Sequence, residues 1–136
     1  MSDEKLTFEI PMRPVAWARA RRSGSRYFTE SKHADAIEEM RWIFLTRCRE
    51  PISGPVSMRI VFNYLKKKKI HKVTDCGIEW KSSRPDLDNL VKLASDAMIG
   101  TVLEDDDQIV ELYAAKRFDK ERDFILLEIV KVKAEK

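Results

Sequence analysis

The sequence predicts an α+β fold in which a mixed sheet is covered by helices. Three observations predict it: segments that alternate like strands, segments with helical periodicity after them, and two further strand-like segments near the C-terminal end. The predicted order of elements is β-α-β-α-β-β. The chain has 136 residues, of which 43% are hydrophobic, and this is enough for one modest core. We therefore expect a single domain over residues 1–136.

The first half of the chain is predicted to form a strand, a helix and a second strand. Residues 6–10 (LTFEI) alternate between apolar and polar, which is typical of a half-buried strand. In residues 31–49 apolar side chains recur at spacings of three and four, as on the buried face of a helix, and Pro51 and Gly54 close this segment. Residues 56–65 (VSMRIVFNYL) alternate again and predict the second strand.

The second half is predicted to form a helix followed by two strands. The helix begins after Asp86, a typical N-cap residue, and ends at Gly100. Its apolar stripe consists of Leu87, Leu90, Val91, Ala94, Ala97 and Met98. Residues 108–118 and 123–133 are rich in the β-branched and aromatic residues that favour strands. The polar segment DKERD between them predicts that these two strands form a hairpin.

Charge is distributed unevenly along the chain, although the formal net charge is only +3. Residues 13–26 contain arginines and no acid, and residues 66–84 are mostly basic. Basic side chains interleaved with aromatic ones, such as Trp17 and Tyr27, suit phosphate contact and base stacking, while a solvated basic surface is the alternative. The candidate DNA contacts are Arg19, Arg21, Arg22, Arg26, Lys66, Lys67, Lys68, Lys69 and Arg84.

Residues 86–107 are acidic instead, with Lys92 as their single basic residue. Asp86 and Asp88 fall in the first turn of the second predicted helix, where the helix dipole favours negative charge. The acids at 105–107 follow the loop that returns from this helix, so a short connection can bring the two groups together. Clustered carboxylates repel unless a cation neutralises them, and oxygen ligands suit Mg²⁺ or Mn²⁺. Helix capping and a solvated acidic loop are the alternative.

Several other site types lack the residues that they require. Val91 and Ala97 stand where an EF-hand loop starting at Asp86 needs a glycine and a glutamate. The sequence has neither a glycine-rich phosphate loop nor a nucleophile elbow. Its first residues lack the charged-then-apolar layout expected of a signal peptide, and no apolar run approaches the roughly 20 residues that span a bilayer. We therefore expect a cytoplasmic protein without membrane contact.

An acidic metal site beside basic segments fits the hydrolysis of a polyanion. Basic side chains would hold the phosphates, and a metal ion would polarise one phosphate and activate a water. The competing hypothesis is a non-catalytic nucleic-acid-binding module, whose acids only cap a helix and keep a loop solvated.

The segment RPDLDNLVKLASDAMIGTVLEDDDQIVEL resembles the core of the RusA-type Holliday junction resolvases. The family pattern has Asp-x-Asp-Asn-x-x-Lys, a following Asp-Ala, a short loop, then Asp-Asp-x-Gln and a strand, and residues 84–117 match it. The earlier segment RPVAWARARRSGSRYFTESK is more loosely similar to the proline- and arginine-rich stretch before the first helix of the family.

The resemblance implies a small homodimeric endonuclease whose substrate is branched DNA, a four-way junction. Such an enzyme resolves Holliday junctions by paired symmetric nicks in DNA recombination and repair, and it uses Mg²⁺, for which Mn²⁺ can substitute. A related nuclease that acts on forks or flaps is the alternative within this class.

The resemblance also assigns roles to individual residues. Asp86, Asp88 and Asp106 would be metal ligands, with Asp105 as a further candidate, and Lys92 would be the basic partner of the scissile phosphate or the leaving oxygen. Lys92 lies one turn beyond Asp88, on the same side of the predicted helix. If the segment EDDDQ is extended, the Asp106 side chain points away from the side chains next to it.

Overall fold

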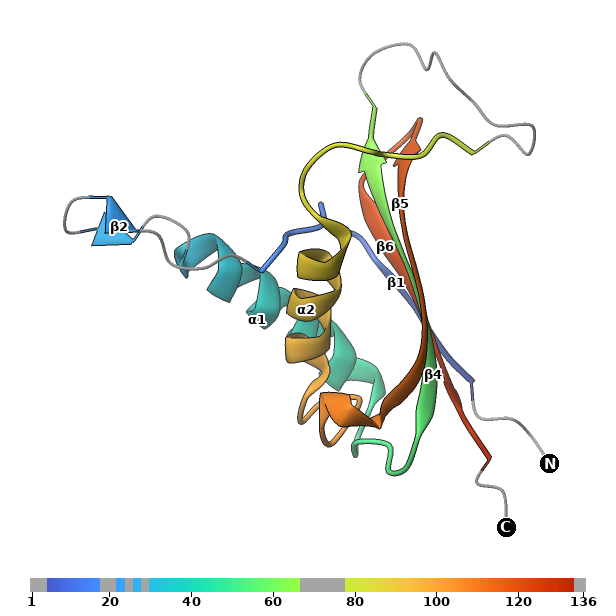
Figure 1. Cartoon of the computed structure of the whole chain (residues 1–136). Helices are drawn as coiled ribbons and strands as arrows, with labels where there is room; N and C mark the ends of the chain where they lie inside the picture. Colours follow the sequence, from blue (N-terminus) through green and yellow to red (C-terminus); the bar gives the residue numbers. More distant parts are fainter. Residues whose placement is uncertain (1–4, 18–21, 24–25, 28–29, 67–77, 134–136) are drawn as a thin grey trace.

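In a computed structural model, the described residues are 5–17, 22–23, 26–27, 30–66 and 78–133. The main sheet is made of four strands: β1 (Lys5–Ile10), β4 (Val56–Leu65), β5 (Ile109–Asp119) and β6 (Phe124–Lys131). Both helices, α1 (Glu30–Arg47) and α2 (Leu87–Met98), lie on one side of this sheet (Figure 1). The α+β class is therefore confirmed, and the sheet is mixed because β4 and β5 run parallel while its other pairs are antiparallel.

Two short elements add to the predicted order. Strands β2 (Arg22–Ser23) and β3 (Arg26–Tyr27) pair as a separate antiparallel hairpin before α1. A 3₁₀ turn, η1 (Asp106–Gln108), precedes β5. Strands of two residues are too short to show alternation in a sequence, so the pattern-based order β-α-β-α-β-β omitted them. Among the described helices, neither is long and apolar enough to cross a membrane.

The predicted hairpin of the two C-terminal strands is wrong. The strand order is β1-β6-β4-β5, so β4 lies between β5 and β6 and pairs with both of them. The reason is visible in the burial of β4: Val61 and Asn63, which alternate with its helix-facing residues, are buried as well. A strand that is buried on both faces is stable only in the centre of a sheet, and this requirement overrides the local pairing of its neighbours.

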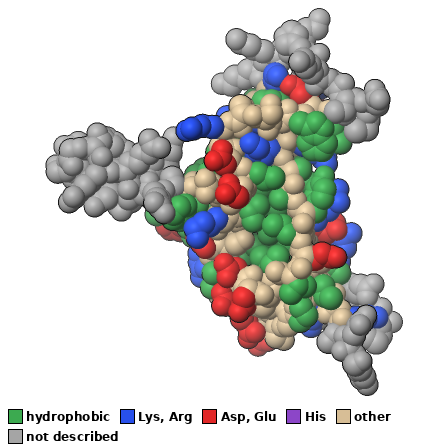
Figure 2. Space-filling view, in the orientation of Figure 1, with side chains coloured by type: hydrophobic (Ala, Val, Ile, Leu, Met, Phe, Trp, Pro, Cys, Tyr) green, Lys and Arg blue, Asp and Glu red, His purple; other side chains and the backbone are tan. Residues whose placement is uncertain are grey.

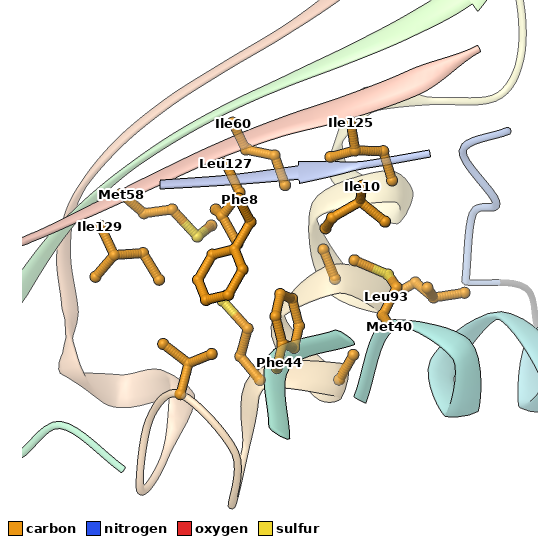
Figure 3. Close-up of a cluster of buried hydrophobic side chains, with 14 of the residues drawn as sticks. Phe8, Ile10, Met40, Phe44, Met58, Ile60, Leu93, Ile125, Leu127 and Ile129 are labelled. Atoms are coloured by element: carbon orange, nitrogen blue, oxygen red, sulfur yellow. The ribbon is translucent and has the colours of Figure 1, made fainter. Parts of the chain in front are cut away.

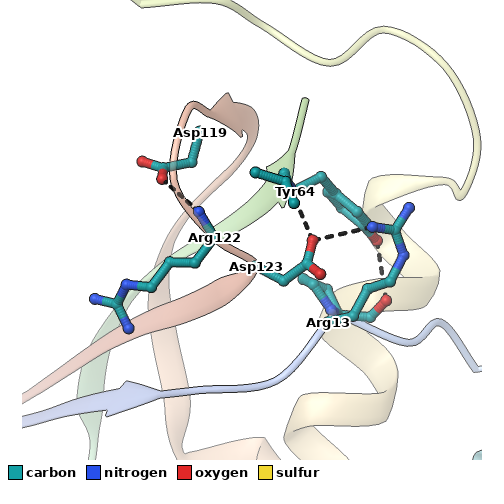
Figure 4. A network of polar contacts seen from close by, with 7 residues as sticks. Arg13, Tyr64, Asp119, Arg122 and Asp123 are labelled. Atoms are coloured by element: carbon teal, nitrogen blue, oxygen red, sulfur yellow. Dashed lines mark hydrogen bonds and ion pairs between the residues drawn. The ribbon is translucent and has the colours of Figure 1, made fainter. Parts of the chain in front are cut away.

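A polar network fixes the connection between β5 and β6 where it passes the end of β4 (Figure 4). The Asp123 carboxylate accepts a hydrogen bond of 2.8 Å from the backbone N–H of Leu65 and forms an ion pair of 3.0 Å with Arg13. The Tyr64 hydroxyl donates to the carbonyl of Pro14 at 3.2 Å. These bonds satisfy backbone groups at the strand end and hold the N-terminal segment 11–17 against it.

The core lies between the sheet and the two helices (Figure 3). The Phe8 ring from β1 meets the Phe44 ring from α1 edge-on, with 5.0 Å between the ring centroids. From α2 the core receives the buried side chains Leu90, Leu93, Ala94, Ala97 and Met98. Because this stripe faces the sheet, Asp88 and Lys92 lie on the opposite, exposed face of α2.

Candidate functional site

The first acidic pair lies at the N-terminal end of α2. Asp86 occupies the N-cap position with extended backbone angles (φ −68°, ψ 140°), as predicted, but within the described chain its side chain makes no capping hydrogen bond. The Asp88 carboxylate accepts a bond of 2.9 Å from the N–H of Asn89, and both side chains are exposed. Capping therefore does not account for the Asp86 carboxylate.

The turn before this pair is held by a lysine from β5. The Lys116 Nζ atom donates to the carbonyls of Ser83 and Pro85, at 2.8 Å each. This side chain shares the helix-facing side of the sheet with Phe62, its partner on β4. An ammonium group bound to two carbonyls fixes the approach of the chain to Asp86. Sequence reasoning did not identify Lys116, since a lysine within a strand pattern carries no signal of a backbone clamp.

The second acidic group is built around η1, and here the expected extended conformation is wrong. The Asp105 carboxylate accepts a bond of 2.8 Å from the N–H of Asp106 and caps the 3₁₀ turn. In return, the Gln108 side-chain oxygen accepts the N–H of Asp105 at 3.0 Å. This reciprocal capping box is more favourable than an extended strand end, so side-chain alternation cannot be applied to residues 105–107.

The Gln108 side chain also attaches this turn to the loop after α1. Its Nε2 atom donates to the carbonyls of Ile52 and Gly54, at 2.8 and 2.7 Å, and its oxygen accepts a second bond, of 2.7 Å, from the N–H of Glu104. With the bond that this oxygen accepts from the N–H of Asp105, the Gln108 amide group takes part in four hydrogen bonds. The Asp-Asp-x-Gln pattern contained this residue, but the sequence did not reveal its structural role.

The surroundings of Asp106 shift its pKa. Partial desolvation, followed by a hydrogen bond with the Asp105 side chain, raises its pKa. The negative charges around it, those of Asp105, Asp96 and Asp107, raise the pKa further. Asp96 on α2 was not among the predicted site residues, although its spacing could have indicated it: Asp88, Lys92 and Asp96 are four residues apart and share one helix face.

Lys92 lies on that face between the two acidic groups. Its ammonium is 4.9 Å from the centre of the Trp17 ring, a cation–π contact. Trp17 is placed by its backbone N–H, which donates to the carbonyl of Asn89 at 2.9 Å. The lysine is exposed and held close to α2, as a group that contacts a substrate phosphate would need to be.

The structure does not bring the two acidic groups together within one chain. Asp96 follows Asp86 by ten positions along α2, which corresponds to about 15 Å at the rise of an α-helix. Asp106 lies at the Asp96 end, where the Asp96 charge acts on it. Figure 2 shows acidic side chains over both ends of α2 and a strip of hydrophobic side chains beside them. Among the described residues, no three His, Cys, Asp or Glu side chains are arranged to hold a metal ion. The carboxylates suit Mg²⁺ chemically, but in a single chain their placement does not fit a three-carboxylate site.

Most of the predicted DNA contacts cannot be placed. Arg19, Arg21, Lys67, Lys68 and Lys69 lie outside the described residues, and the side chains of Arg22 and Arg26 in the β2–β3 hairpin are also outside the description. Lys66 forms an ion pair with the buried Glu79 and lies over the Phe118 ring at 4.4 Å. Arg84 is exposed in the turn that leads to Asp86.

Comparison with known proteins shows which family this chain resembles. The family model described as endodeoxyribonuclease RusA matches residues 11–129. A Bacillus subtilis (strain 168) protein called uncharacterized protein YqaN is 28% identical over 127 residues, which cover 85% of this chain and 89% of the relative. A protein of Lactococcus phage r1t named crossover junction endodeoxyribonuclease rusA is 35% identical over 78 residues, 57% of this chain and 56% of the phage protein.

Proposed function

The chain belongs to the RusA endodeoxyribonuclease family, and from this premise we propose that it is a Mg²⁺-dependent, structure-selective DNA endonuclease. Its substrate would be a four-way DNA junction, which it would resolve by paired symmetric nicks during recombination and repair. The phage relative, whose name describes a crossover junction endodeoxyribonuclease, supports this choice of substrate.

One observation carries the proposal: the family match extends through both acidic groups and through the lysine between them. Asp86, Asp88 and Lys92 are exposed on or next to one helix, and Asp106 is exposed in the turn that follows it. Carboxylates that crowd one another are unfavourable in the absence of a cation, and the pKa of Asp106 is raised by desolvation, by its hydrogen bond with Asp105 and by the acids around it. Clustered acids of this kind are typical of functional sites.

We assign the residues as follows. In the homodimer that the family resemblance implies, Asp86, Asp88 and Asp106 would hold Mg²⁺, or Mn²⁺ in its place, with Asp105 supporting Asp106 through the cap of η1. The metal, when bound, supplies charge neutralisation at the scissile phosphate. Lys92 would contact the same phosphate with its ammonium group, which Trp17 keeps over α2.

Two other functions remain open to test. A nuclease of the same family could prefer forks or flaps, because preference among branched substrates would depend on the DNA contacts that the sequence predicts for residues 19–26 and 66–69. A non-catalytic binding module is the second, and the capping role of Asp105 favours it, since that carboxylate has a structural explanation that needs no metal.

The first prediction tests the proposed function directly. We expect Asp88→Asn to abolish Mg²⁺-dependent cleavage of a four-way junction while junction binding stays within a few-fold, because DNA is held mainly by basic phosphate contacts. Cleavage and binding are measured with junction, fork and linear duplex of equal sequence, with and without chelator. The matched control is Asp35→Asn, an exposed acid on α1, which should cleave normally. Undiminished cleavage by purified Asp88→Asn contradicts the proposal.

A further inference from the structure

Four cationic side chains lie near one another at the end of the sheet where α2 begins (Figure 1). The rings of Tyr64 and Phe118 pair across β4 and β5 at this end, and three of the four cations lie over them. We call this group the basic cluster; it consists of Arg13, Lys66, Lys81 and Lys116. Positive charge is therefore concentrated next to the segment that leads into Asp86.

Three members of the basic cluster have partners within the fold. Arg13 forms an ion pair of 3.0 Å with Asp123 (Figure 4), and Lys66 forms an ion pair with the buried Glu79. Lys116 donates to the two backbone carbonyls of the turn before α2, as described above. These three cations therefore have a structural role that needs no ligand.

Lys81 is the member of the cluster without a carboxylate. Among the residues that the structure describes, no acid lies within ion-pair distance of its ammonium. The ammonium donates to the Ser83 hydroxyl at 2.9 Å and lies 4.8 and 5.1 Å from the centres of the Tyr64 and Phe118 rings. An ammonium has three protons to donate, so this bond leaves donor capacity. Ser83 is exposed, and a ligand can therefore reach the pair from solvent.

The cluster destabilises this ammonium in the free protein. Partial burial, followed by the positive charges of Lys116, Arg13 and Lys66, lowers the pKa of Lys81. A lowered lysine pKa means that the surroundings disfavour the charged form, and an anion bound beside the ammonium would offset this effect. The cluster thus provides an accessible cation that an anionic ligand would stabilise.

We propose that Lys81 and Ser83 form a binding site for one backbone phosphate of the DNA strand that the chain would cut. The ammonium would donate to one phosphate oxygen, and the Ser83 hydroxyl, which accepts from Lys81, would donate its own proton to another. The inference rests on the proposed function, because it concerns how the same substrate is held. Lys81 was not among the predicted DNA contacts, since it stands apart from the run of lysines at 66–69.

The position of this site relative to Asp86 determines which phosphate it would bind. Ser83 precedes Asp86 by three positions, so their Cα atoms are at most about 11 Å apart. Along one strand of B-DNA a phosphate recurs about every 3.4 Å of helix axis. The bound phosphate would therefore lie within about three nucleotides of the phosphate that is cut. Because Lys116 fixes the backbone between the two sites, a strand bound at Lys81 would be held in register with Asp86.

The alternative is that Lys81 only holds the turn before α2. That turn is already fixed by the two bonds from Lys116, whereas the bond between Lys81 and Ser83 is exposed, and exposed polar contacts contribute little to stability. We therefore expect Lys81→Gln to leave the midpoint of denaturant unfolding unchanged or to raise it, because it removes one of several crowded positive charges. A lowered midpoint together with unchanged DNA binding assigns Lys81 to the turn and overturns the inference.

Binding of a four-way junction at different salt concentrations tests the contact directly, with chelator present so that no strand is cut. We expect Lys81→Gln to bind more weakly at low salt and to flatten the slope of log affinity against log salt by about 0.9, the value for one phosphate contact on B-DNA. Lys81→Arg keeps a cation and should keep the slope. The control is Lys5→Gln, because Lys5 is paired with Glu128 at 3.1 Å at the opposite end of the sheet. An unchanged slope in Lys81→Gln shows that the inference is wrong.

Junctions with a single neutral linkage identify the phosphate. After the cut position is mapped in Mg²⁺, a methylphosphonate replaces, one at a time, each of the three phosphates on either side of it in the cut strand. At one position we expect the wild-type protein to lose as much affinity as Lys81→Gln loses on the unmodified junction, and Lys81→Gln to lose nothing further. Such non-additive losses indicate a direct contact. Losses that add at every position overturn the inference.

Cleavage in Mg²⁺ separates this inference from the proposed function. We expect Lys81→Gln to need a several-fold higher protein concentration for half-maximal single-turnover cleavage and to reach nearly the wild-type maximum rate, because a contact made equally in the ground state and the transition state affects binding alone. If the wild-type chain cuts no junction while Lys81→Gln still flattens the salt slope in chelator, the proposed function fails and the phosphate site stands. If the wild-type chain cuts junctions and Lys81→Gln binds them with the wild-type affinity and slope, the phosphate site alone is overturned.

Discussion

At the scale of single residues, three consecutive aspartates have different surroundings. Asp105 caps η1 through its carboxylate, and its backbone N–H is bound by Gln108. Asp106 has a raised pKa because of desolvation and the acids around it, which include Asp96 on α2. Asp107 is exposed, like the other two, and follows Asp106 in the turn. One run of identical residues therefore contains a structural carboxylate and a candidate ligand.

The second prediction is an order of effects for these three positions. We expect Asp106→Asn to be as inactive as Asp88→Asn, because it removes a proposed ligand. Asp105→Asn should be impaired, since an amide is a weaker cap and positions Asp106 less well. Asp107→Asn should be nearly normal. Single-turnover cleavage of a four-way junction measures the order, and a normal Asp106→Asn beside an inactive Asp107→Asn would show that the assignment is wrong by one residue.

At the scale of elements, Gln108 connects η1 to the loop between α1 and β4. Its amide donates to two carbonyls and accepts from two backbone N–H groups. The third prediction is that Gln108→Glu destabilises the fold, because a carboxylate would face the carbonyls of Ile52 and Gly54 without a proton to donate. Each unsatisfied group costs about 1–3 kcal/mol.

Denaturant unfolding and cleavage together test this role. We expect Gln108→Glu to lower both the free energy of unfolding and the cleavage rate, since Asp106 loses its support. Gln108→Met keeps the length of the side chain but leaves all four backbone partners unpaired, and should also lower both. A Gln108→Glu protein with unchanged stability and rate would show that the turn is held by other contacts.

The elements with strong periodicity were predictable, and those fixed by distant partners were not. The strand at 56–65 and most of the apolar stripe of α2 were predicted from spacing alone, because burial selects residues at the period of the element. The buried Leu93 was missed, and the predicted Leu87 and Val91 are only partly buried. The order of the strands was missed because it depends on β4 entering between β5 and β6, a non-local contact that leaves no spacing signal in either strand. Among the features of the strands, only the burial of β4 on both faces indicates its central position in the sheet.

In the candidate site, too, the features set by local sequence were predictable and those set by distant partners were not. The sequence placed Asp86 at the start of α2 and Lys92 on its outer face, both from helix chemistry. It did not identify Lys116 and Gln108, which act on backbone carbonyls, because their partners are 31 or more residues away along the chain. It expected one chain to unite the acidic groups, whereas the length of α2 keeps them apart.

At the scale of the whole molecule, the proposed dimer gives the two-fold symmetry that paired nicks require. A four-way junction presents two equivalent strands, and two identical sites related by one axis can address both. One chain has one such group of acids, so it can make only one nick at a time.

DNA affinity is also a property of the whole molecule, because it is the sum of phosphate contacts made by many basic side chains. The fourth prediction concerns the arginines at 19, 21, 22 and 26 and the lysines at 67, 68 and 69. Each phosphate contact that is lost should flatten the slope of log affinity against log salt by about 0.9 for B-DNA. Glutamine substitutions within either group should therefore reduce both the affinity at low salt and this slope.

Lys66 serves as the matched control for this prediction, because it is the neighbour of the lysine group in sequence but has a partner in the fold. Its ammonium is paired with Glu79 and lies over Phe118, so its charge is already neutralised. We expect Lys66→Gln to lower the free energy of unfolding, since it leaves the buried Glu79 carboxylate without its cation, and to leave the salt slope unchanged. Junction binding measured from about 50 to 200 mM salt distinguishes the two kinds of lysine. A slope that Lys66→Gln flattens as much as Lys67→Gln would show that the ion pair opens when DNA binds, and a slope that neither group changes would leave both as solvated surface.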